Sequence, residues 1–91
     1  KNKDMLTDKF INVTRTFLEK FNDRYHTDYN YNIVYSDISI NPYNEWDFDS
    51  LDMVEYIMHL EEAYEIEISD ELVIELKTIG ELCDFCENKS K

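Results

Sequence analysis

Ser50 is the residue whose type and position most directly suggest chemistry. It lies between Asp49 and Leu51 in a stretch, residues 49–71, that is rich in acids and contains no lysine or arginine. A serine at a helix start can cap the helix through its side-chain oxygen, or its hydroxyl can carry an attached group. No basic partner is near it to make it a hydrolytic nucleophile. The residues alone favour the helix cap.

The acids around Ser50 do not match a calcium-binding loop. An EF-hand loop that began at Asp47 would need an oxygen ligand at its fifth position, glycine at its sixth and glutamate at its twelfth. The sequence has Leu51, Asp52 and Met58 at those positions. We therefore predict no metal site here.

Cys83 and Cys86 form a single CxxC pair, a spacing that can serve zinc binding or redox chemistry. A zinc site would need further ligands and a redox motif would need a preceding strand, and the sequence indicates neither. Both cysteines fall on the apolar side of a short predicted helix, where buried thiols are common. We predict structural cysteines, solvated side chains for His26 and His59, and no catalytic group.

The composition predicts one small domain over residues 1–91. Hydrophobic residues make up 43% of the chain, enough for a packed core, while glycine and proline occur once each. Few turn formers favour helices over a turn-rich β protein. Two cysteines form no disulfide framework, so we expect a reducing compartment. That is the cytoplasm, or an organelle if a targeting segment was removed before Lys1.

The net charge of −12 is concentrated in the middle of the chain. Between Arg24 and Lys77 there is no lysine or arginine, and this interval holds 14 of the 21 acids. Such a surface repels nucleic acid and anionic lipid and attracts basic protein patches. No apolar run is long enough to span a bilayer, and no signal-peptide pattern is present. We expect protein partners, no nucleic acid and no membrane insertion.

The spacing of apolar residues predicts four helices. One helix face in residues 5–22 is made of Leu6, Phe10, Val13, Phe17 and Phe21. A second helix is predicted over residues 50–64. Ser69 can cap a short third helix, and a capping box that begins at Thr78 can start a fourth.

Residues 23–48 lose the helical period and predict one long loop with at most a helical turn inside it. The alternation of Tyr31, Ile33 and Tyr35 could mark a strand, but no partner strand is apparent. Because the segment is rich in aromatic and aliphatic residues, we expect it to pack against the body of the protein.

The helix predicted over residues 50–64 has two apolar stripes. The first stripe, the expected core face, is made of Met53, Tyr56, Ile57, Leu60 and Tyr64. The second stripe, on another side of the helix, is made of Leu51, Val54 and Met58, flanked by Glu55, Glu61, Glu62 and Glu65. A helix needs only one stripe for a core. The second stripe therefore either packs under the long loop or forms an exposed docking strip.

Residues 49–71 closely resemble the second helix and following turn of acyl carrier proteins. The matching segments are Asp49-Ser50-Leu51, Asp52, Val54-Glu55, Met58-x-Leu60-Glu61-Glu62 and Glu67-Ile68-x-Asp70-Glu71. They span about a quarter of the chain and are specific as a set. The usual family turn is Gly-x-Asp-Ser-Leu, and the glycine position here holds Asp47. Aspartate is one of the few residues that tolerate a positive φ.

The resemblance implies an all-α, four-helix bundle with a long loop between its first two helices and a short third helix. It implies that Ser50 carries 4′-phosphopantetheine, added from coenzyme A by a phosphopantetheinyl transferase, and holds acyl groups as thioesters. The close match favours fatty acid biosynthesis. The alternatives are a specialised polyketide, peptide or acyl-transfer pathway, and a carrier-like interaction module that is never modified.

The resemblance and the second stripe together predict how partners bind. We expect a monomer, without enzymatic activity, that docks acyl-transferring and chain-elongating enzymes through their basic patches. The predicted docking residues are Asp49, Leu51, Asp52, Val54, Glu55, Met58, Glu61 and Glu62. The resemblance also implies that an acyl chain shelters in an interior built from Phe10, Phe17, Ile57, Leu60 and Phe85.

Overall fold

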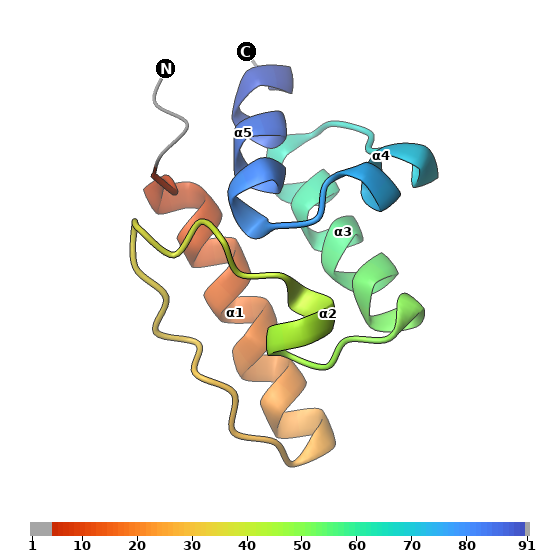
Figure 1. The fold of residues 1–91 in the computed structure, drawn as a ribbon. Helices are drawn as coiled ribbons and strands as arrows, with labels where there is room; N and C mark the ends of the chain where they lie inside the picture. Colours follow the sequence, from red (N-terminus) through yellow and green to blue (C-terminus); the bar gives the residue numbers. More distant parts are fainter. Residues whose placement is uncertain (1–4, 91) are drawn as a thin grey trace.

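The computed structural model describes residues 5–90, which form five helices and no strand. Three helices are long, namely α1 (Asp8–Tyr25), α3 (Ser50–Tyr64) and α5 (Ile79–Lys89), and two are short, namely α2 (Pro42–Glu45) and α4 (Asp70–Glu75). In Figure 1, α3 packs against α1 and α5, and α4 lies at the edge of the molecule beyond them. The all-α prediction is confirmed, and α2 is the helical turn within the predicted loop.

Helix α1 begins at Asp8, three residues later than predicted, because Thr7 caps it. The Thr7 Oγ1 atom accepts a 3.3 Å hydrogen bond from the Phe10 amide. Leu6 is buried as expected but precedes the helix, and Val13 is only half-buried. The residues of α1 that are fully buried are Phe10, Ile11, Thr14, Phe17, Leu18 and Phe21.

The loop between α1 and α2 packs on the helices, as predicted. Ile33 is its fully buried residue, whereas Tyr35 is exposed, and no strand forms there. The end of the loop binds the start of α5, because the carbonyl of Ile38 accepts the Gly80 amide at 3.0 Å and the carbonyl of Ile40 accepts the Ile79 amide at 2.8 Å. A side chain at position 80 would place its Cβ atom 2.5 Å from the Ile38 oxygen, so this contact requires glycine.

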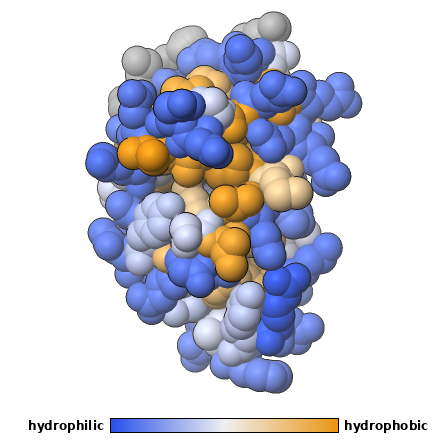
Figure 2. All heavy atoms as spheres, turned by 90° about the vertical axis from the view of Figure 1, so that its right-hand side faces the viewer, coloured by the Kyte–Doolittle hydropathy of each residue, from blue (hydrophilic) through white to orange (hydrophobic). Residues whose placement is uncertain are grey.

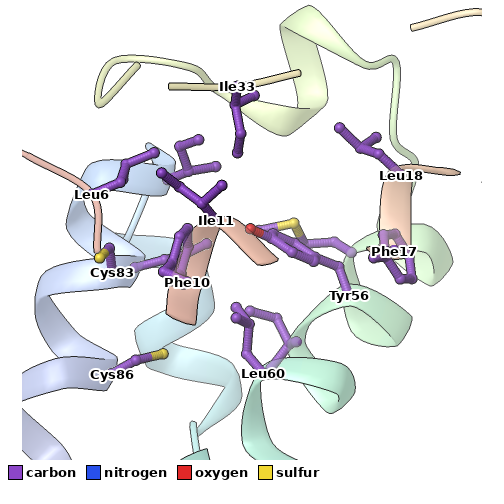
Figure 3. Packing of buried hydrophobic residues seen from close by; sticks show 14 of the residues in the cluster. Leu6, Phe10, Ile11, Phe17, Leu18, Ile33, Tyr56, Leu60, Cys83 and Cys86 are labelled. Carbon is purple, nitrogen blue, oxygen red and sulfur yellow. The ribbon is translucent and has the colours of Figure 1, made fainter. Parts of the chain in front are cut away.

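Side chains from α1, α3, α5 and the loop converge on one core (Figure 3). All five residues of the first stripe are buried, as predicted. The buried hydroxyls of Thr14 and Tyr56 share a 2.7 Å hydrogen bond between α1 and α3, so neither polar group is left unpaired. Burial raises the pKa of the Tyr56 phenol far above its usual value.

Helix α5 adds Cys83 and Cys86 to this core, which confirms that both cysteines are buried thiols. Burial raises the pKa of Cys83 and raises that of Cys86 to about 12. Phe85, expected among the interior residues, is only half-buried, because α5 turns this side chain toward a surface groove beside Leu76 and Lys89. Phe85 therefore packs against the edge of the core and does not lie fully inside it.

Candidate functional site

Helix α3 is capped by Asp49, not by Ser50. The Asp49 Oδ1 atom accepts the Asp52 amide at 2.9 Å, and the Asp52 Oδ2 atom accepts the Asp49 amide at 3.1 Å. This reciprocal pair is a capping box, and it makes Ser50 the first residue inside the helix. The interpretation of Ser50 as a helix cap is wrong, because the preceding carboxylate already fills that role.

The hydroxyl of Ser50 is accessible. The side chain is exposed and forms no hydrogen bond with any part of the chain that the structure describes. It lies at the amino-terminal end of a 15-residue helix, where the helix dipole favours an anion. The backbone amides of Ser50 and Leu51 have no acceptor within residues 5–90, so two donors face the same end.

The turn that presents Ser50 is firmly held. Asp47 has a φ of 53°, the left-handed conformation that glycine adopts most readily. This conformation explains why the usual residue at this position is glycine. On either side of it, Trp46 and Phe48 are buried with their ring centroids 5.5 Å apart. Phe48 also meets Phe17 of α1 edge to face at 5.7 Å. These contacts fix where α3 starts.

The second stripe of α3 is exposed. Leu51 is 73% exposed, Val54 50% and Met58 56%, so the stripe does not pack under the long loop. Ile74 of α4, which the sequence analysis did not single out, is 73% exposed. Figure 2 views the side on which α3 and α4 lie and shows hydrophobic residues gathered in the middle of it, bordered by hydrophilic ones.

The acids beside the second stripe differ in how they are bound within the protein. Glu55 Oε1 lies 3.2 Å from Arg24 Nη1, and Glu61 Oε2 accepts the Ile68 amide at 2.8 Å in the turn after α3. Glu62 is exposed and has no polar partner in the described part of the chain. Partial burial, with repulsion from Asp49, raises the pKa of Asp52.

His59 is half-buried, not fully solvated as the sequence analysis predicts. Its Nδ1 atom lies 2.9 Å from the Glu55 carbonyl oxygen, and its ring meets Phe17 edge to face with centroids 5.0 Å apart. The side chain is half-buried because it lies at the border of the first stripe. His26 is exposed and ends α1 in the left-handed conformation.

Other kinds of site find no support in the described residues. Within residues 5–90, no group of three or more histidine, cysteine or acidic side chains is arranged to hold a metal ion. No helix in this range is both long and apolar enough to cross a membrane.

The fold and the site define a class, namely a small helical domain that presents one free serine hydroxyl at the start of a capped helix. The family model described as "Phosphopantetheine attachment site" matches residues 37–86, more than half of the chain. The chain therefore belongs to the acyl carrier protein family, as a phosphopantetheine-attachment carrier domain. The prosthetic group of this family is 4′-phosphopantetheine, and its members are carriers, not catalysts.

Curated relatives of the chain are named as acyl carrier proteins or homologues of them. The chain is 51% identical over 43 residues to "Acyl carrier protein" of Buchnera aphidicola subsp. Schizaphis graminum, covering 47% of this chain and 54% of the relative. It is 41% identical over 49 residues to "Acyl carrier protein homolog" of Mycoplasmopsis pulmonis, covering 54% and 67%. It is 54% identical over 41 residues to "Acyl carrier protein" of Thermosynechococcus vestitus, covering 45% and 51%. The chain thus spans about half the length of most of these relatives.

Proposed function

We propose that Ser50 is the attachment site of 4′-phosphopantetheine and that the protein carries acyl groups as thioesters on this arm. The observation that carries the proposal is the exposed, unbonded hydroxyl of Ser50 at the first residue of α3. The site suits a phosphodiester, because the free amides of Ser50 and Leu51 and the helix dipole favour its negative charge. Asp49 and Asp52 already accept amides of the same turn, which limits their opposition to a second anion.

The second stripe and its acids form the proposed docking surface. Leu51, Val54 and Met58 provide apolar contact area directly after the attachment residue, and the acids attract basic patches on partners. The proposed set also includes Asp49, Asp52, Glu55, Glu61 and Glu62. The partners would be a phosphopantetheinyl transferase and the acyl-transferring and chain-elongating enzymes, whose active sites the loaded arm could then enter.

Fatty acid biosynthesis is the pathway that the Asp-Ser-Leu segment and the names of the relatives favour. The protein would act there as a monomeric cytoplasmic carrier, with residues 1–91 as one domain and no catalytic group of its own. A specialised polyketide, peptide or acyl-transfer pathway would use the same arm. Incubation of the loaded protein with purified enzymes of each pathway distinguishes them, and fatty acid enzymes should be the ones that extend its acyl group.

The attachment itself is tested by intact mass spectrometry after incubation with coenzyme A and a broad-specificity phosphopantetheinyl transferase. The wild-type protein should gain one phosphopantetheine, and Ser50→Ala should gain none. Ser69→Ala is the matched control, because Ser69 also lies at a helix start but caps α4 through its side chain. This control should be modified normally. Modification of another residue would refute Ser50 as the attachment site, and no modification with several transferases would favour the interaction module that is never modified.

A further inference from the structure

Arg24 is a base that lies inside the acidic docking surface. It is the last residue but one of α1, and its Nη1 atom is 3.2 Å from Glu55 Oε1. The guanidinium also lies over the ring of Tyr25, 5.7 Å from its centroid. No other lysine or arginine follows in the sequence until Lys77. Arg24 therefore places a single positive charge against one of the acids proposed to attract partners.

The pair belongs to a hollow of about 490 Å³ between the end of α1 and the outer side of α3. Its lining is made of Arg24, Glu55, Met58, His59, Glu61 and Glu62. Four of these six residues, namely Glu55, Met58, Glu61 and Glu62, are proposed docking residues. A partner that binds this part of α3 would therefore also contact Arg24. The lining of this hollow is therefore mixed in charge, with the Arg24 guanidinium beside three glutamates.

We infer that Arg24 is a specificity-determining residue that competes with the basic side chains of partners for Glu55. The inference rests on the proposed docking function of α3. The Arg24 and Glu55 side chains are 60% and 46% exposed, and such ion pairs are weak enough for a partner to break. The displaced guanidinium stays within a Debye length of the incoming base, about 10 Å, and repels it. Partners with a neutral or acidic side chain opposite Arg24 are therefore favoured over uniformly basic ones.

The experiment uses the full chain as substrate of a phosphopantetheinyl transferase with a basic docking surface, with coenzyme A in excess. Arg24→Ala should lower the KM for the protein about two- to five-fold, the range expected when a weak surface ion pair no longer competes. The kcat should stay unchanged, because Arg24 affects binding and not the transfer. Raised salt should reduce the difference between the two proteins.

Arg15→Ala is the matched control. Arg15 is exposed on the same helix and bonds Asn32 of the loop at 3.2 Å, and its removal changes the net charge by the same amount. It should leave KM close to the wild-type value. In a Glu55→Gln background, Arg24→Ala should lose most of its effect, because no carboxylate remains to compete for.

The outcomes separate this inference from the function on which it rests. If all variants are modified and Arg24→Ala matches Arg15→Ala, the competition is refuted while the carrier function stands. If Arg24→Ala keeps its full effect in the Glu55→Gln background, Arg24 acts through general repulsion and not through Glu55, which also overturns the inference. If the wild-type protein is never modified, the proposed function fails and the inference fails with it.

Discussion

The hydroxyl of Tyr29 donates a 2.8 Å hydrogen bond to the carboxylate of Asp47, 18 residues further along the chain. This bond joins the beginning of the long loop to the turn that precedes Ser50, and it raises the pKa of the Tyr29 phenol. Asp47 holds the left-handed conformation at the position where the family usually has glycine. The hydrogen bond from Tyr29 therefore helps to hold an aspartate in a left-handed conformation that glycine usually provides.

The left-handed turn predicts an order of stability among variants of Asp47. Asp47→Ala should lower the free energy of unfolding by about 1–2 kcal/mol, because alanine lacks the polar side chain that lets aspartate adopt a positive φ, and because the bond to Tyr29 is lost. Asp47→Gly should be less harmful, since glycine adopts this conformation freely. Urea unfolding measures both. Tyr29→Phe is the control for the hydrogen bond alone, and a glycine variant less stable than the alanine variant would contradict the assignment.

Asp52 predicts a pH dependence of stability at the start of α3. Its folded pKa is raised by partial burial and by Asp49, so the folded protein binds more protons than the unfolded chain between the usual pKa of 3.8 and the raised value. The contribution of Asp52 to stability therefore falls as pH rises through this window. Asp52→Asn keeps an oxygen for the capping box and cannot ionise. Its stability relative to the wild type should increase from pH 3 to pH 6, and a constant difference would refute the sign.

The two stripes of α3 predict different mutational effects. Leu60→Ala should lower the free energy of unfolding by about 2–5 kcal/mol, because it opens a cavity in the core. Val54→Ala and Met58→Ala remove exposed atoms and should cost less than about 1 kcal/mol, yet they should slow transfer to partners. Chemical unfolding and transferase kinetics provide the two measurements. Equal destabilisation by Val54→Ala and Leu60→Ala would show that the second stripe belongs to the core.

The burial of both cysteines predicts that they are protected from alkylation in the folded protein. At pH 8, neither Cys83 nor Cys86 should react readily with a thiol reagent, because both are buried and their pKa values are raised. Both should react within minutes after unfolding in guanidinium chloride. A colorimetric thiol assay with and without denaturant decides this, and rapid modification of the folded protein would contradict the structural role.

Features set by neighbouring residues were predictable from the sequence. Helix α3 has the predicted bounds because its apolar period is regular, and the caps at Ser69 and Thr78 formed because each side chain bonds an amide three residues away. The apolar period was misleading at the start of α1, because Leu6 continues the apolar spacing although the helix begins only after its N-cap, Thr7. The three-residue spacing of Asp49 and Asp52 is the sequence signal for the true cap of α3. The interpretation of Ser50 as the cap overlooked this spacing, because serine is itself a common capping residue.

Contacts between distant segments were not predictable in the same way. The Arg24–Glu55 pair joins residues 31 positions apart, and its partners are known only once α1 and α3 are packed together. The bond from Tyr29 to Asp47 likewise depends on the path of a loop that has no period. The exposure of Ile74 follows from how α4 rests on its neighbours, because no residue of this short helix is fully buried.

The seating of the long loop on the first turn of α5 has a kinetic consequence. The bonds from Gly80 and Ile79 to the carbonyls of Ile38 and Ile40 join segments about 40 residues apart, and closing such a loop costs roughly 3 kcal/mol of chain entropy. This closure should therefore contribute to the folding barrier, so Gly80→Ala, which crowds the Ile38 carbonyl, should slow refolding in stopped-flow measurements, whereas Asn88→Ala on the same helix should not. Neither the loop nor the start of α5 can reach its final state without the other, so the two halves of the chain acquire their structure together.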